Sequence, residues 1–160
     1  MSYKILFNDN ELALVRNSFP IIFELIATSD TKIDRKEKTA YNQFLSNIRK
    51  LNSPLINEII VDDITNIEDL NNNNNKELKN SLRQLNEILD LKLEREEQVE
   101  FKKILIAFGY YIAQSSGSLF DHKFSDDEED ILNQIGYILN ISVRDLFLSG
   151  EIEKILNKLR

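Results

Sequence analysis

The chain has 160 residues, of which 42% are hydrophobic and 29% charged; this composition excludes a disordered chain and is typical of a globular protein with a full hydrophobic core. Its net charge of −7 disfavours nucleic-acid partners, because an acidic surface repels phosphate backbones and the basic residues form no stripe. The absence of cysteine excludes disulfides, thiolate metal sites and cysteine nucleophiles.

The sequence predicts neither an export signal nor a membrane-spanning segment. Residues 1–10 lack an apolar core of signal-peptide length, and the longest uncharged run, residues 104–120, is interrupted by Gln, Ser and Gly. We therefore expect a cytoplasmic protein with no integral membrane segment. Tyr3, Ile5 and Phe7 occupy alternate positions, as in a strand. No second strand is evident, so the sequence predicts an extended arm packed on the rest of the protein.

Helical periodicity dominates the rest of the chain. Apolar residues spaced by three and four predict a first helix over about residues 10–28, which Pro20 should kink or split. A capping box of Asp34 and Glu37 opens the second helix, because each side chain can satisfy a free backbone donor at the helix start. The buried face of that helix is expected at Tyr41, Phe44 and Ile48.

A third helix should begin at Ser53 and Pro54, with the serine as cap and the proline in the first turn. The asparagine run over residues 71–75 predicts a solvent loop, because asparagine favours turns over helix interiors. A fourth helix follows. Its apolar face is expected at Leu78, Leu82, Leu85, Ile88 and Leu89.

Residues 95–115 give the strongest helical pattern. This segment is apolar on most sides, so it should lie in the middle of a bundle, where Gly109 would permit a close helix crossing. A second capping box, Ser125 with Glu128, opens a helix that Asn140 closes. A short helix then begins at Ser142. A final amphipathic helix is predicted over residues 151–160.

The sequence contains one helix–loop–helix pattern twice. Ile26-Ala27 precedes a polar loop and the box ending at Glu37, and Ile112-Ala113 precedes a loop five residues longer and the box ending at Glu128. Apolar residues then recur at matching offsets, pairing Tyr41 with Leu132, Phe44 with Ile135 and Ile48 with Leu139. We predict an all-α single domain over residues 1–160, a bundle of about seven to eight helices with an internal pseudo-two-fold repeat. Its halves would cover about residues 11–70 and 76–148.

These repeated residues resemble the tellurite-resistance TerB-like family. The shared pattern is an apolar helix ending in Ala, a polar Asp-containing loop, an Ile or Phe, and a Ser/Asp-x-x-Glu box. It is carried by Ile26, Ala27, Asp30, Ile33, Asp34 and Glu37, and again by Ile112, Ala113, Phe124, Ser125 and Glu128. The resemblance covers about residues 11–50 and 95–148. It implies a pseudo-symmetric helical bundle associated with stress responses, with chemical and phage resistance, and with divalent metal binding at acidic loops.

Acidic residues at the two loops are the candidate metal ligands. If the two copies face each other, their carboxylates would form an oxygen-rich cleft of the kind that Ca²⁺ or Mg²⁺ prefers. The candidate ligands are Asp30, Asp34, Glu37, Asp121 and Glu128. A local alternative needs no metal, because negative residues in the first turn of a helix are favoured by its dipole and by its free backbone donors.

No catalytic motif is present. His122 is the only histidine, so one chain cannot build a zinc site of several His or Cys ligands, and no glycine-rich phosphate loop or nucleophile elbow occurs. We expect a non-enzymatic binding module whose partners are other proteins, a second copy of itself, or divalent cations. One alternative is a structural partner subunit or homo-oligomeric scaffold that docks through residues 151–160. Another is a metal-dependent hydrolase that uses the paired acids.

Overall fold

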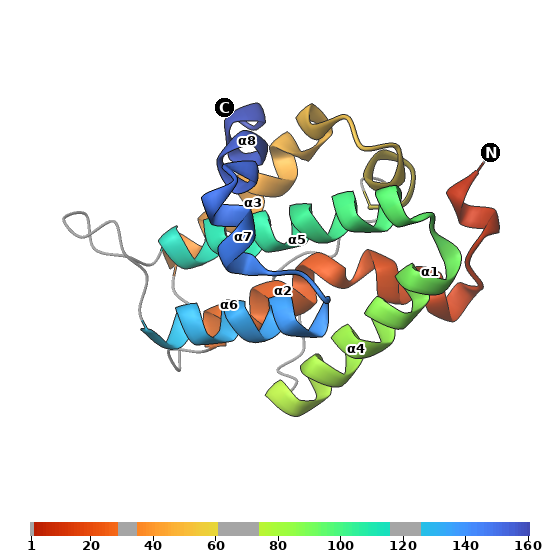
Figure 1. Cartoon of the computed structure of the whole chain (residues 1–160), viewed down its shortest axis with the longest axis horizontal. Helices are drawn as coiled ribbons and strands as arrows, with labels where there is room; N and C mark the ends of the chain where they lie inside the picture. Colours follow the sequence, from red (N-terminus) through yellow and green to blue (C-terminus); the bar gives the residue numbers. More distant parts are fainter. Residues whose placement is uncertain (1, 29–34, 61–73, 116–125) are drawn as a thin grey trace.

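The computed structural model describes residues 2–28, 35–60, 74–115 and 126–160 (Figure 1). In these ranges the chain is all-α, as predicted, with eight α-helices, two short 3-10 helices, one π-helical segment and no strand. In chain order the elements are η1 (Tyr3–Ile5), α1 (Asp9–Arg16), α2 (Ser18–Ala27), α3 (Arg35–Asn47), η3 (Ile48–Leu51), the π-helical η4 (Ile56–Ile60), α4 (Asn75–Lys92), α5 (Arg95–Ser115), α6 (Asp126–Ile138), α7 (Val143–Leu148) and α8 (Glu151–Lys158). No helix in this described part is both long enough and apolar enough to cross a bilayer.

Helix α5 runs through the middle of the molecule, with α3 and α8 on one side and α2, α4 and α6 on the other (Figure 1). This confirms the position predicted from its apolar surface. Residues Phe101, Ile104, Leu105, Phe108 and Ile112 are all buried. They belong to one continuous hydrophobic cluster to which the described helices α1 to α8 contribute.

Aromatic rings connect the first half of the chain to α5. The Phe108 ring of α5 lies 5.1 Å from Phe19 of α2 and 4.9 Å from Phe44 of α3, centroid to centroid, and both contacts are T-shaped. Phe19 also meets Phe101 at 6.2 Å. Edge-to-face pairs place the positive ring edge against the negative face, so they add specific geometry to the burial of a large apolar area.

The helix predicted over residues 10–28 is split in two, because α1 ends at Arg16 and α2 begins at Ser18, which confirms the predicted effect of Pro20. Pro20 accounts for the break. A proline has no N–H for the carbonyl four residues earlier, and its ring collides with that carbonyl. Here that carbonyl belongs to Arg16, the last residue of α1, and Pro20 itself lies in the first turn of α2, where no such partner is needed.

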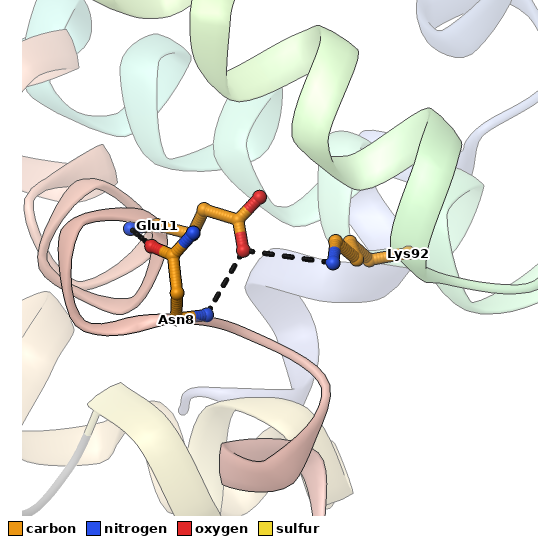
Figure 2. A network of polar contacts seen from close by, with 3 residues as sticks. All are labelled: Asn8, Glu11 and Lys92. Atoms are coloured by element: carbon orange, nitrogen blue, oxygen red, sulfur yellow. Dashed lines mark hydrogen bonds and ion pairs between the residues drawn. The ribbon is translucent and has the colours of Figure 1, made fainter.

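Helix α1 begins with a capping box that also connects it to α4 (Figure 2). The Glu11 N–H donates to Asn8 Oδ1 at 2.8 Å, and the Asn8 N–H donates to Glu11 Oε1 at 2.9 Å. The same Glu11 carboxylate lies 3.7 Å from the ammonium of Lys92 at the end of α4. The glutamate of this local cap therefore also contacts a helix that is distant in sequence.

The predicted extended arm at residues 3–7 is wrong. Tyr3–Ile5 forms the 3-10 helix η1, in which Ile5 is 80% exposed, while Phe7 is buried. The carboxylate of Glu58 explains the helical turn, because it accepts the Tyr3 and Lys4 N–H groups at 3.0 and 3.2 Å and also the Ser2 hydroxyl. A residue more than fifty positions away thus satisfies the free donors that an isolated turn would leave to water.

Side-chain caps begin two further elements. The Ile56 N–H donates to Ser53 Oγ at 3.3 Å, as predicted, although the residues that follow form a π-helix. The Glu77 N–H donates to Asn74 Oδ1 at 2.8 Å, so α4 begins at Asn75. The predicted loop over residues 71–75 was therefore too long at its end, because asparagine is a strong N-cap; residues 71–73 lie outside the described ranges.

The C-terminal region follows the predicted order. Asn140 ends α6 in the left-handed conformation (φ 57°), and the Ile141 N–H returns to the carbonyl of Gly136 at 2.9 Å. Ser142 caps α7, accepting the Asp145 N–H at 3.2 Å. Helix α8 then packs on α5, α7 and η3. Its apolar face carries the buried Ile152 and the half-buried Ile155, Leu156 and Leu159.

The positions matched by the predicted repeat all lie in the interior. Both members of every pair are buried, including the two glutamates. The pairs are Ile26 and Ile112, Ala27 and Ala113, Glu37 and Glu128, Tyr41 and Leu132, Phe44 and Ile135, and Ile48 and Leu139. This burial is compatible with two equivalent hairpins, α2–α3 and α5–α6, while the pseudo-two-fold repeat itself stays a prediction.

Candidate functional site

The structure describes two of the five predicted metal ligands. Glu37 is the third residue of α3 and is 3% exposed; Glu128 is the third residue of α6 and is 1% exposed. Asp30, Asp34 and Asp121 lie outside the described residues. The third helical position is where a capping box places its glutamate, so both positions suit the local alternative as well as a metal.

Metal ligands do not gather in the described part of the chain. In residues 2–28, 35–60, 74–115 and 126–160, no group of three or more His, Cys, Asp or Glu side chains could hold an ion. Glu37 and Glu128 therefore make no complete site with other described residues. Any cation site of the predicted composition would need Asp30, Asp34 or Asp121.

An open groove of about 590 Å³ lies between α3 and the C-terminal end of α5. Its described lining is Arg35, Lys36, Thr39, Ala40 and Gln43 from α3, and Tyr111, Gln114 and Ser115 from α5. Arg35 is the first residue of α3, directly after residues 29–34, and Ser115 is the last residue of α5, directly before residues 116–125. The groove thus lies where both predicted loops join the helices.

Hydrogen bonds and ring packing hold the α5 wall of the groove. The Tyr111 ring lies 5.6 Å from that of Phe44, and its hydroxyl donates to Gln43 Oε1 across the groove at 3.2 Å. Gln114 Nε2 donates to the Tyr110 hydroxyl at 2.5 Å. Tyr111 therefore presents a fixed aromatic surface, and the amides of Gln43 and Gln114 add polar groups beside it.

The described lining of the groove carries positive charge in a protein whose net charge is −7. Arg35 and Lys36 are exposed, and none of the described lining residues is acidic. Glu37, which follows them in sequence, is turned into the interior. The groove therefore combines an aromatic wall and amide groups with two cations at its edge.

Sequence reasoning missed this groove. The available signal was the segment Arg35-Lys36-Glu37-Lys38, in which three cations surround the glutamate of the capping box. Helical spacing would have turned Glu37 inward and its neighbours outward. Arg35 and Lys36 share a surface with Tyr111 only because of the way α3 packs on α5. The periodicity of the sequence does not reveal that packing.

Two further charged side chains are buried and were not predicted. Lys102 of α5 is 3% exposed and donates to Asp90 Oδ1 of α4 at 2.7 Å and to Gln98 Oε1 at 3.1 Å, so it connects two helices. Glu24 of α2 is 4% exposed, and burial raises the pKa of its carboxyl group. Neither residue lines the α3–α5 groove.

Comparison with known proteins gives no relative for this chain. No family model, no curated protein and no solved structure matches it. The TerB-like resemblance therefore stays a prediction from the repeated residues. Support for a function comes from the chain's own grooves, charges and burial.

Proposed function

We propose that this chain is a non-enzymatic binding module of the TerB-like kind, and that the α3–α5 groove binds an acidic segment of a partner protein. One observation carries the proposal. In a chain of net charge −7, the described lining of this groove includes two exposed cations, Arg35 and Lys36, and no acid. Opposite charge at an interface steers the encounter and selects the partner.

The other lining residues suit a peptide. The groove volume of about 590 Å³ lies within the usual range for ligand sites. Ala40 and the Tyr111 ring offer apolar surface, and the amides of Gln43 and Gln114 can exchange hydrogen bonds with a peptide backbone. An acidic segment with interspersed apolar residues would meet all three kinds of surface.

The hydroxyl groups in the groove favour binding over catalysis. Thr39 Oγ1 donates to the Arg35 carbonyl at 2.9 Å, and Ser115 Oγ donates to the Ile112 carbonyl at 2.6 Å. An activated nucleophile instead donates to a neighbouring general base. No described lining residue is a histidine or a carboxylate that could be that base. The alternative of a metal-dependent hydrolase would rest on Asp30, Asp34 and Asp121, outside the described ranges.

Fluorescence anisotropy with a labelled peptide of alternating glutamate and leucine tests the proposal. The double variant Arg35→Glu, Lys36→Glu should bind about tenfold more weakly or worse, because two attractive contacts become repulsive. Negative residues in the first turn are favoured by the helix dipole, so α3 should persist. The control Lys154→Glu, Lys158→Glu on α8 makes the same change in net charge and should bind normally. Equal affinity of all three proteins, or tighter binding of a glutamine–leucine peptide, contradicts the proposal.

Weak Ca²⁺ or Mg²⁺ binding is a second candidate function. The observation behind it is that Arg35 and Ser115, which line one groove, directly adjoin in sequence the segments 29–34 and 116–125, which contain Asp30, Asp34 and Asp121. Titration calorimetry with each chloride salt should give heat on the parent chain, and Asp30→Asn, Asp121→Asn should abolish it. A flat trace on the parent chain removes this candidate and leaves the peptide proposal intact.

An association with stress or tellurite resistance is proposed from the TerB-like resemblance alone. Cells that express the chain should then survive tellurite exposure better than cells with an empty vector. Expression of the Arg35→Glu, Lys36→Glu protein should give no protection if the groove mediates the effect. Equal survival of cells with and without the parent chain would refute this association.

A further inference from the structure

Exposed apolar residues gather on α6 and α7. Of the five large hydrophobic residues that are exposed in the described ranges, three lie here: Tyr137 is 85% exposed, Leu148 76% and Phe147 38%. Tyr137 belongs to α6, and the other two belong to α7, which packs on α6. We call this surface, with the exposed side of α6, the α6–α7 face.

Two hollows flank the exposed side of α6. The first, of about 400 Å³, lies between α4 and α6 and is lined in part by Lys79, Arg83 and Tyr137. The second, of about 390 Å³, lies between α6 and α7 and is lined in part by Glu129 and Phe147. Asn133 lines both hollows, so they adjoin one another across α6.

The second hollow has a preformed apolar interior. Leu132 of α6 and Val143 of α7 line it, together with Phe147. The Phe147 ring packs against that of Tyr110 on α5 at 4.8 Å in a T-shaped contact, which holds this wall in place. The hollow therefore offers a large side chain an apolar surface, one wall of which is held by ring packing.

The α6–α7 face and the adjoining surface of α4 carry charges of both signs. Lys79 and Arg83 lie at the first hollow with Asp130, and Glu129 and Arg144 lie at the second. The face thus has protruding apolar side chains and hollows, cations and acids. Such a face can complement itself, which is what a two-fold interface asks of one patch.

We propose that the α6–α7 face binds the same face of a second copy of this chain across a two-fold axis near Asn133. The two α6 helices cross at Asn133 in antiparallel directions. A residue that follows Asn133 in one copy therefore lies beside the residue that precedes Asn133 by the same number of positions in the second copy. Tyr137 then meets the second copy's Glu129, which lines the apolar hollow. Tyr137 enters this hollow, and Arg83 beside Tyr137 pairs with the second copy's Glu129. This inference is independent of the α3–α5 groove.

Sedimentation equilibrium of the full chain tests the proposal. The parent chain should show a monomer–dimer equilibrium. Moderate salt should not abolish it, because two copies of net charge −7 repel at low ionic strength. Tyr137→Arg should weaken the dimer about tenfold or more. The control Leu91→Arg replaces an apolar side chain that is 79% exposed on α4, and it should dimerise like the parent. A parent chain that is monomeric at every concentration, or equal dissociation of both variants, overturns the proposal.

A charge exchange tests the pairing itself. Arg83→Glu alone should weaken self-association, because it opposes the second copy's Glu129. Glu129→Arg alone should weaken it as well, because it opposes the second copy's Arg83. A mixture of the two variants should form a heterodimer, since each copy then presents a charge opposite to its neighbour's at both contacts. Thermal melts that match the parent confirm that both variants are folded. Failure of the folded variants to associate when mixed overturns this arrangement.

Discussion

Gly109 of α5 lies directly against Leu132 of α6, so that a Cβ atom on residue 109 would stand 2.9 Å from Leu132 Cδ1. The same Cβ would stand 3.4 Å from Ile22 Cγ2 of α2. Two helices from different parts of the chain therefore approach the backbone of α5 at one point. The sequence predicted a close crossing at Gly109, and the structure confirms it.

Replacing glycine at two helix contacts should give unequal losses of stability. At Gly136 a Cβ atom would lie 2.5 Å from Val143 Cγ2 and 2.9 Å from the backbone oxygen of Ile141, in the turn that ends α6. We expect Gly136→Ala to lower the free energy of unfolding by about 1–3 kcal/mol, the usual cost of overpacking. Gly109→Ala should cost less, because the tip of Leu132 can move, whereas the Ile141 oxygen beside residue 136 belongs to the backbone. Urea unfolding measures both; a Gly136→Ala protein as stable as the parent contradicts the contact.

Removing the charge of Glu24 should stabilise the protein. Burial raises the pKa of this carboxyl group, so the folded state favours its protonated form. The stability contributed by the protonated group is fully present below pH 4.5 and is lost as the pH rises through the folded-state pKa. Glu24→Gln should therefore raise the free energy of unfolding at neutral pH. The advantage should vanish in acid, where both proteins carry a neutral group. Urea unfolding of both proteins at neutral and at acidic pH tests this. A gain in unfolding free energy that persists in acid would show that the charge of Glu24 is not its cause.

Removing the Tyr3 hydroxyl should destabilise the N-terminal turn. This hydroxyl donates to the Glu97 carboxylate on α5, and the hydrogen bond raises the pKa of Tyr3 to about 12. The stability that this bond contributes is fully present below pH 10 and is lost as the pH rises through about 12. Tyr3→Phe should cost about 1 kcal/mol at neutral pH. Burial also raises the pKa values of Tyr41 and Tyr110. Ultraviolet titration should therefore show one fewer late-titrating tyrosine in Tyr3→Phe than in the parent; an equal number of late tyrosines in both proteins would argue against this bond.

A charge in the centre of the bundle should prevent folding. Ile112 of α5 is 0% exposed. Ile112→Asp would place an unpaired carboxylate there, which costs more than about 3 kcal/mol of a total stability that is typically about 5–15 kcal/mol. The matched control Ile112→Val removes one methyl group and should cost about 1 kcal/mol. Circular dichroism during heating distinguishes the two outcomes. A soluble Ile112→Asp protein with a cooperative melt would contradict the central position of α5.

Local signals were sufficient for most helices. Periodicity placed α5 at Arg95–Ser115, and short-range side-chain caps placed the start of α7 and the turn around Ser53. Local signals failed where a distant residue decides the backbone. The helical turn at Tyr3–Ile5 depends on Glu58, and no pattern within residues 1–10 contains that information.

The candidate site was less accessible to sequence reasoning than the fold. Acidic residues suggested a cation site, and the two described members of that set, Glu37 and Glu128, are buried in the first turns of their helices. The groove at that end has a basic described lining instead. Its cations come from α3 and its aromatic wall from α5, so only the packing of two helices distant in sequence brings Arg35 and Tyr111 together.

Amide NMR spectra of the isotope-labelled full chain, titrated with the glutamate–leucine peptide, locate the surface to which the peptide binds. If the α3–α5 groove binds the peptide, saturable shifts should appear at its residues. These are Thr39, Gln43, Tyr111 and Gln114. The groove between α5 and α8 carries Arg95, Lys103 and Lys158 against Glu96, Glu100 and Glu151, so it should stay unchanged. Shifts centred on the α5–α8 groove, or no saturable shift at any peptide concentration, would contradict the account.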